Sequence, residues 1–274
     1  MTATIISICN QKGGVGKTTA TVNLGKNLAG MNKRVLLVDN DPQWGNLSLV
    51  LFGDEKPAEI LSTPHSVGSA STLFLYFEEF EGAPYRFSDN IDVFGADRAL
   101  ANVSTMDSGD ACEFFSNNIH KFVDQYDYIL IDCPPTLGNL QVSAFYASHG
   151  YIIPTHLENL SIGGLENLIK DAEKVARRRK SELELLGVVV NSVQGKLNIA
   201  GEPRVQLQKV FYRQLQDQFG DKIFNTKITH SAKVSESHAM LESIFEYDPN
   251  SQQSQQYLKL TKELLDRCGE SAHA

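Results

Sequence analysis

A stretch of eight residues near the start of the chain, KGGVGKTT at positions 12–19, combines glycines, lysines and hydroxyls in an order that suits phosphate chemistry. It follows an apolar, β-branched run at 4–8 that is typical of a buried strand, and it precedes a helical pattern at 20–29. In a glycine-rich turn between a strand and a helix, backbone N–H groups point inward and the helix dipole favours negative charge. The pattern therefore predicts a phosphate-binding loop.

The polar side chains of this stretch each have a place in such a loop. Lys17 can reach the β- and γ-phosphates of a nucleotide, and the Thr18 hydroxyl can ligate magnesium. Lys12 stands at the entrance of the loop, where it is poorly placed for its own phosphates but able to reach a nucleotide held by a second subunit. The alternative is a glycine-rich turn without a ligand. The predicted nucleotide contacts are Gly13, Gly14, Val15, Gly16, Lys17, Thr18 and Thr19.

Three aspartates are predicted to lie at the carboxyl ends of strands. Asp39 ends one apolar run, Asp41 follows it, and Asp132 ends a second apolar run. Ligands of open α/β sheets gather at this edge, and carboxylates beside phosphates need magnesium or water between them. We therefore expect Asp39 and Asp132 to join Thr18 around a magnesium ion, with helix capping as the alternative for Asp39 and Asp41.

Strand and helix patterns alternate along the rest of the chain. This alternation predicts an α/β protein with a mostly parallel twisted sheet and helices on both faces, in one domain over 1–274. Asn191, at the end of a predicted strand, either hydrogen-bonds the adenine edge of a nucleotide or forms a turn. Residues 53–90 show no clear pattern, although an aromatic run at 74–80 predicts a small core helix. Further strands are predicted at 91–94, 150–154, 185–191 and 222–224, and further helices at 111–122, 160–179, 205–219 and 251–267.

Three segments resemble one known family. KGGVGKTT resembles the deviant Walker A motif of the ParA/MinD ATPases, VLLVDNDPQ at 35–43 resembles their Walker A′ segment, and DCPPTLG at 132–138 resembles their Walker B and switch region. The resemblance implies that Lys12 crosses a dimer interface and takes part in catalysis with Lys17. It also implies that Asp41 orients the attacking water and that Asp39 helps to hold the magnesium shell.

The same resemblance implies a fold and a function. The fold is that of a P-loop NTPase, and the activity is hydrolysis of ATP with Mg²⁺ in an ATP-dependent homodimer. In ParA-like systems the dimer binds DNA nonspecifically, and a ParB-like partner protein stimulates hydrolysis. We therefore expect an ATPase that segregates or positions a plasmid, a chromosome or another large cargo.

Composition limits where and how such a protein can act. The chain has 274 residues, 42% of them hydrophobic, and a formal net charge of −8, so nucleic acid can bind only through a local basic patch. No apolar run approaches the ~20 residues of a membrane span. The N-terminus lacks the basic and apolar regions of a secretion signal. We expect a cytoplasmic protein, associated with the nucleoid when it binds DNA and without stable membrane association. Four cysteines with no paired spacing predict reduced, buried thiols.

A basic cluster near the end of the helix predicted at 160–179 is a candidate DNA contact. Arg177, Arg178, Arg179 and Lys180 can neutralise several phosphates. The alternative is a solvated helix end, because cations also complement the helix dipole there. Around 229–231 the proline-arginine pair usual in the family is missing. Further basic candidates are Lys174, Lys196, Arg204, Lys209, Arg213 and Lys233.

Other functions on the same scaffold remain open at this point. A MinD-type regulator recruited to membranes requires a basic amphipathic C-terminal helix, whereas the helix at 251–267 is predicted to pack as a closing element. An iron–sulfur or redox enzyme requires grouped cysteines, and only Cys112 and Cys133 could pair across a dimer. A metabolic ligase or kinase is a further alternative.

Overall fold

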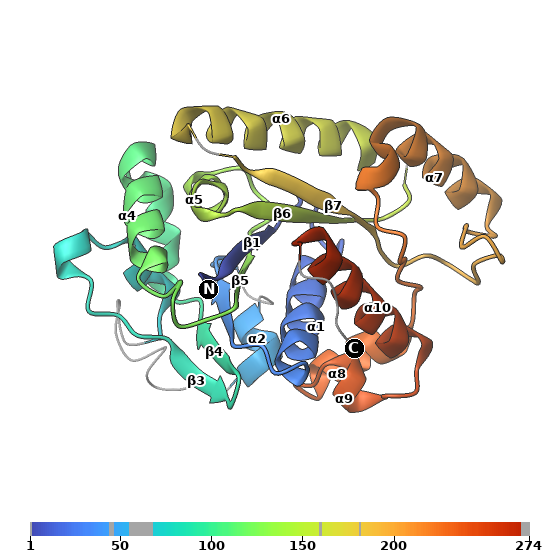
Figure 1. Cartoon of the computed structure of the whole chain (residues 1–274), viewed down its shortest axis with the longest axis horizontal. Helices are drawn as coiled ribbons and strands as arrows, with labels where there is room; N and C mark the ends of the chain where they lie inside the picture. Colours follow the sequence, from blue (N-terminus) through green and yellow to red (C-terminus); the bar gives the residue numbers. More distant parts are fainter. Residues whose placement is uncertain (1, 44–46, 55–67, 159–160, 181, 270–274) are drawn as a thin grey trace.

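The computed structural model describes residues 2–43, 47–54, 68–158, 161–180 and 182–269. The strands are β1 (Thr4–Ile8), β2 (Val35–Asp39), β3 (Tyr85–Ser88), β4 (Ile91–Phe94), β5 (Tyr128–Asp132), β6 (Gly150–Thr155) and β7 (Glu184–Val190). Within the described residues they form one sheet in the order β3-β4-β2-β5-β1-β6-β7 (Figure 1). Every neighbouring pair is parallel except β3 and β4. The predicted P-loop NTPase fold is confirmed.

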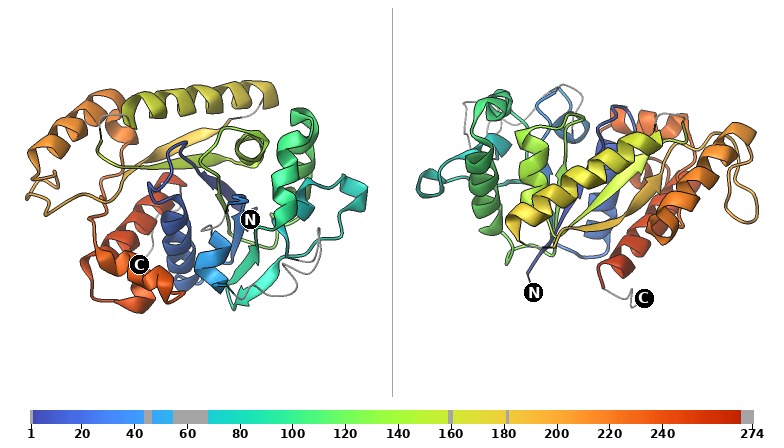
Figure 2. Two further views of the ribbon diagram at one scale, coloured as in Figure 1. Left: turned by 180° about the vertical axis from the view of Figure 1, so that it is seen from behind. Right: turned by 90° about the horizontal axis from the view of Figure 1, so that it is seen from above.

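Helices cover both faces of this sheet (Figures 1 and 2). One face packs against α1 (Lys17–Gly30), α2 (Leu47–Phe52), α8 (Ala232–Ala239), α9 (Ile244–Tyr247) and α10 (Gln252–Arg267). The other packs against α4 (Ser108–His120), α5 (Asn139–Ala147), α6 (Ser161–Arg179) and α7 (Gln206–Phe219). Because β1, β2 and β5 lie between these two layers, their runs are apolar on both sides and buried throughout the interior.

The register of the central strands brings the chemistry-bearing residues to one edge. Ile8 lies opposite Asp132 across β1 and β5, and Asp39 lies opposite Asp132 across β2 and β5. The loop that leaves β1 toward α1 therefore begins beside Asp132, with Asp39 one strand further along the same edge. The helix lies against β1, so the sheet fixes both ends of this loop.

The last strand predicted, at 222–224, is wrong. The chain instead makes a short 3₁₀ turn, η4 (Gly220–Lys222), and Ile223 forms only an isolated bridge with Val188. The physical reason is Arg267, whose guanidinium donates to the carbonyls of Asp221, Lys222 and Ile223. The Arg267 side chain thus uses backbone carbonyls that, in a regular strand, would accept hydrogen bonds from a neighbouring strand.

The poorly patterned stretch holds two short 3₁₀ pieces and an edge strand. The aromatic run spans the end of η1 (Ala70–Phe74) and η2 (Phe77–Glu79). Phe80 is buried, whereas Tyr76 and Phe77 are exposed, so the predicted small core helix is only partly right. β3, which pairs antiparallel with β4, was not predicted. Residues 55–67 lie outside the described residues.

The described thiols match the predicted reduced state. Cys9, Cys112 and Cys133 are free and buried, and Cys268 is free and half-buried. Burial raises the pKa of the Cys9 and Cys112 thiols, which makes them poor nucleophiles. Among the described residues no three His, Cys, Asp or Glu side chains gather as a metal-binding group. A search of the described helices finds none with the length and apolarity to cross a membrane.

Candidate functional site

The loop between β1 and α1 has the backbone of an anion site. Gly14 and Gly16 have φ of 72° and 93°, in the left-handed region that favours glycine. α1 begins at Lys17 with no side-chain cap and no acidic residue in its first turn, so no carboxylate of that turn offsets the positive end of the helix. A cleft of about 310 Å³ lies over this loop. The predicted phosphate-binding loop is therefore present, at the carboxyl end of β1.

The two lysines of the loop lie in different surroundings. Lys17 is 7% exposed and lines the cleft, and its Nζ donates to the Lys12 carbonyl at 3.4 Å. Lys12 points away, with 39% of its side chain exposed, and forms an ion pair with Glu158 just after β6. The Lys12 ammonium holds the pKa of Glu158 below its usual range. Lys17 thus faces the cleft of its own chain, while Lys12 lies on the outer surface beside it.

Asp132 lies directly beneath the start of α1. It accepts a hydrogen bond of 2.7 Å from the Thr18 hydroxyl and a longer one of 3.4 Å from the Thr21 hydroxyl. Burial and, after it, the nearby Asp39 carboxylate raise the pKa of Asp132 to about 8. The structure therefore brings together Thr18 and Asp132, two oxygen-bearing residues of the predicted magnesium site.

Asp39 and Asp41 have distinct positions at the end of β2. Asp39 is fully buried and accepts hydrogen bonds from the backbone N–H and the hydroxyl of Ser48, in the first turn of α2. This is the capping role that the sequence left open for it. Asp41 lines the cleft, where burial raises the pKa of its carboxyl group and a hydrogen bond from Gln43 N–H opposes that shift. Asp41 is thus the aspartate of this pair that faces the cleft.

Asn191 joins the end of β7 to the phosphate-binding loop. Its Nδ2 donates to the Val15 carbonyl at 2.8 Å. A Cβ placed on Gly16 would lie 2.1 Å from the same Nδ2, so a side chain at this position would displace the amide. The side chain also lines a second pocket, next to the loop, together with Thr19 and the segment 228–231. Neither sequence alternative, an adenine contact or a turn, included this contact with the loop.

Comparisons with known proteins agree with this geometry. A family model described as an AAA domain matches residues 3–185. The chain is 32% identical to the sporulation initiation inhibitor protein Soj of Bacillus subtilis over 262 residues, which cover 95% of this chain and 97% of Soj. It is also 32% identical to the chromosome partitioning protein ParA of Caulobacter vibrioides over 273 residues, 96% of this chain and 94% of that protein. The chain belongs to the ParA/MinD family of ATPases.

One solved structure resembles this chain in its fold. Cobyrinic acid a,c-diamide synthase from Mycobacterium smegmatis, with a bound ATP analog and magnesium, superimposes with a TM-score of 0.74 at 23% identity. The match covers 97% of this chain and 96% of that one. At this identity the likeness supports the fold alone.

The described site of this ParA/MinD ATPase fits a nucleoside triphosphate with magnesium. Lys17 is a buried cation, and among the described residues no carboxylate forms an ion pair with it. The positive end of α1 and the turn at Gly14 and Gly16 suit phosphate oxygens. Thr18 and Asp132 offer the hard oxygen donors that magnesium prefers. Charge, backbone and donor set therefore agree with one class of ligand.

The basic cluster of this ParA/MinD ATPase is smaller than the sequence suggests. Arg179 is half-buried, and its Nη1 donates to the Ser148 carbonyl at 2.7 Å, at the end of α5. Burial lowers the pKa of its guanidinium. Arg177, Arg178 and Lys180 are exposed. They lie where α6 leads back toward the start of β7, at the opposite end of the strands from the phosphate-binding loop.

One site residue, Glu158, was missed from the sequence. It follows β6 at the same carboxyl edge as Asp39 and Asp132, so the rule that selected those two aspartates could have selected it. The signal is weaker because two residues, His156 and Leu157, separate Glu158 from the described end of β6 rather than leaving it at the strand end. Its contact with Lys12 can be seen only in three dimensions.

Proposed function

We propose that this ParA/MinD ATPase binds ATP with Mg²⁺ and acts as a dimerisation switch that positions DNA or another large cargo. The observation that carries the proposal is the buried Lys17 ammonium, whose described partner is a backbone carbonyl 3.4 Å away. A buried charge without a counter-ion is costly, and a phosphate group in the adjoining cleft would supply that counter-ion.

The roles of the remaining residues follow from their positions. Bound ATP and Mg²⁺ would supply the reacting phosphate and the charge that neutralises it. Thr18 and Asp132 would hold the magnesium ion, with Asp39 behind them in the outer shell. Asp41, which lines the cleft, would orient the attacking water. Phosphoryl transfer needs little more from a protein than this positioning and charge neutralisation.

Pairing of two chains would use Lys12. Its side chain lies outside its own cleft and is partly exposed, so it can reach a triphosphate in a second copy. In the single chain, the Lys12 ammonium forms an ion pair with Glu158. A triphosphate carries more charge than one carboxylate, and Lys12 would therefore exchange partners when ATP-loaded chains meet. Loss of the γ-phosphate would remove that difference in affinity and release the dimer.

Cargo binding would use the exposed part of the basic cluster. Arg177, Arg178 and Lys180 are exposed at the opposite end of the strands from Lys12, so pairing through Lys12 would leave both copies of this cluster accessible to DNA. Contacts of this kind are nonspecific and sensitive to salt. A ParB-like partner would then stimulate hydrolysis, as the resemblance implies.

The C-terminal helix favours DNA over a membrane as the cargo surface. In α10 the side chains of Tyr257, Leu260 and Leu264 are buried in the core that also holds α1. α10 and α1 lie side by side in the views of Figures 1 and 2. A MinD-type anchor needs an apolar helix face that is free to enter lipid, and this face is already covered.

The test is a DNA-retention assay with ATP, ADP or no nucleotide over a range of salt concentrations. We expect retention only with ATP, weakening as salt rises and lost in Lys17→Ala. Neutralising Arg177, Arg178 and Lys180 together should reduce retention without reducing ATP binding. Retention that ignores the nucleotide would contradict the switch, and ATP-dependent binding to liposomes instead of DNA would favour the MinD-type function.

A further inference from the structure

Beside the phosphate-binding loop lies a second pocket that the catalytic roles leave unexplained. It shares Gly14, Gly16 and Thr19 with the loop and is closed on the other side by the segment 228–231. Asp41, which would orient the attacking water, lines a different cavity, the cleft over the loop. A nucleotide whose phosphates occupy the loop would therefore place its base in this second pocket.

The segment 228–231 is joined to the end of β7. Val193 N–H donates to the Ile228 carbonyl at 2.9 Å, and His230 N–H donates to the Val193 carbonyl at 2.8 Å. Thr229 lies between these two hydrogen bonds, opposite Val193 in an isolated bridge. The position of Thr229 therefore sets the spacing between this wall of the pocket and β7.

Two glutamines of α10 hold Thr229 from behind. Gln256 Oε1 accepts hydrogen bonds from the Thr229 backbone N–H at 2.9 Å and from its hydroxyl at 3.1 Å. Gln253 Nε2 donates to the Thr229 hydroxyl at 2.8 Å and to its carbonyl at 3.3 Å. The backbone donor, the backbone acceptor and the hydroxyl of Thr229 are thus all fixed by one helix.

These glutamines are unusual residues for their position. Gln253 and Gln256 are 7% and 9% exposed, on the same face of α10 as buried Tyr257 and Leu260. A buried amide that is not fully hydrogen-bonded is destabilising, and an apolar side chain would pack there without that risk. Their described side-chain hydrogen bonds go to Thr229. The side-chain amides of both glutamines therefore serve to hold Thr229, one residue of the pocket wall, in place.

We propose that Gln253 and Gln256 are positioning residues for recognition of the nucleotide base, acting through Thr229 without contacting the nucleotide. This inference rests on the proposed function, since it assumes that a nucleotide occupies the loop. It assigns α10 a role beyond closing the core. The helix holds the wall against which the base is selected, while the loop alone holds the phosphates.

The test compares ATP with inorganic tripolyphosphate, which carries the phosphates without ribose or base. Binding of each to the full chain is measured by calorimetry for wild type and for Gln256→Leu. Because the Thr229 N–H and hydroxyl lose their acceptor, we expect ATP affinity to fall about tenfold and tripolyphosphate affinity to change less than about twofold. Gln256→Glu, which keeps an acceptor, should recover most of the ATP affinity.

The control is Gln255→Leu, an exposed glutamine on the same helix, which should leave both affinities unchanged. Thermal melting checks folding, and Gln253→Leu serves as a second variant if Gln256→Leu does not fold. Unchanged ATP affinity in the folded variant would overturn the inference, as would equal losses for ATP and tripolyphosphate. Failure of the wild-type chain to bind ATP would remove the proposed function as well.

Discussion

The phosphate half of the nucleotide cleft and its base half are built in different ways. The phosphate half is one continuous stretch, 12–19, shaped by two glycines with positive φ and by the start of α1. The base half is assembled from the end of β7, the segment 228–231 and α10. Local backbone conformation makes the first half, and side-chain hydrogen bonds between distant segments make the second.

Because of this difference, we expect single substitutions to affect nucleotide binding differently in the two halves. A local loop depends on a few residue types, so the largest single loss of affinity is expected there, at its buried lysine. An assembled wall shares its hydrogen bonds among several side chains, so single changes should weaken it in part. Four substitutions, in the two halves and in the contacts around them, test this difference.

The largest effect is expected from Lys17→Ala in the phosphate half. A hydrogen bond to a charged group contributes about 1.5–3 kcal/mol, and every 1.4 kcal/mol is tenfold in affinity, so ATP binding should weaken roughly 100-fold. Calorimetry with ATP and Mg²⁺ measures the change. Lys26→Ala is the matched control, because Lys26 lies on the same helix but pairs with Glu246. Normal ATP affinity in Lys17→Ala would remove the nucleotide-site assignment.

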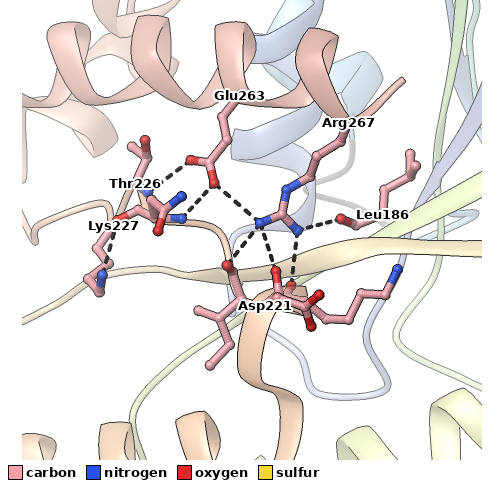
Figure 3. Close-up of polar contacts among 9 residues, drawn as sticks. Leu186, Asp221, Thr226, Lys227, Glu263 and Arg267 are labelled. Atoms are coloured by element: carbon pink, nitrogen blue, oxygen red, sulfur yellow. Dashed lines mark hydrogen bonds and ion pairs between the residues drawn. The ribbon is translucent and has the colours of Figure 1, made fainter. Parts of the chain in front are cut away.

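The next effect concerns stability, in α10, whose first turns hold Thr229 and whose last residue, Arg267, contacts β7 near its start. Figure 3 shows Arg267 of α10 reaching across to the end of the sheet, where it donates to the carbonyls of Leu186, Asp221, Lys222 and Ile223 and also meets Glu263. Its guanidinium carbon also lies 4.0 Å from the centre of the Phe224 ring. These contacts tie α10 to β7 and to η4, the short turn that follows α7.

Arg267→Ala should therefore lower the free energy of unfolding by about 2–3 kcal/mol, since four carbonyls, most of them partly buried, lose their donor. That corresponds to a fall in Tm of roughly 4–6 °C for a chain of this size. Arg267→Lys should restore little, because an ammonium cannot reproduce the planar fork. Lys259→Ala, on the exposed face of α10, is the control. A Tm within one degree of wild type would show that these contacts carry no stability.

The same contrast explains which parts of the fold and the site can be predicted from the sequence. β1, the loop and α1 follow from an apolar run, glycines and a hydroxylated helix start, all within about 25 neighbouring residues. Asp132 could be placed because it ends an apolar strand, and parallel strands deliver their ends to one edge. Local patterns of this kind determine most of the sheet and the phosphate half of the site.

The parts that the sequence did not predict depend on contacts between distant residues. Nothing around Lys222 indicates that Arg267 would take its carbonyl, 45 positions away, and so a strand was predicted there. Gln256 looks like any polar residue of an amphipathic helix until its buried side chain is seen on Thr229. Arg179 likewise looks like part of a basic cluster, although the Ser148 carbonyl holds it.

A smaller effect is expected where the two halves touch, at Gly16. Alanine there would adopt a left-handed φ of 93° and bring a Cβ to 2.1 Å from Asn191 Nδ2. Strain of this kind costs about 1–3 kcal/mol, so Gly16→Ala should weaken ATP binding about tenfold. Gly30→Ala is the matched control, since a Cβ on Gly30, at the end of α1, meets nothing within 4 Å. Equal ATP affinities for the two variants would show that the loop tolerates a side chain.

The smallest effect is expected from Glu158→Gln, which releases Lys12 from its own chain. Surface ion pairs contribute about 0.2–1 kcal/mol, and a symmetric dimer would break two of them. The variant should therefore form the ATP-dependent dimer about fivefold more tightly, whereas Lys12→Ala should impair it. Sedimentation with a nonhydrolysable ATP analogue measures both. Glu184→Gln, which disrupts the exposed Lys222–Glu184 pair at the other end of the sheet, is the control. If Glu158→Gln weakens the dimer instead, the glutamate stabilises the paired state rather than competing with it.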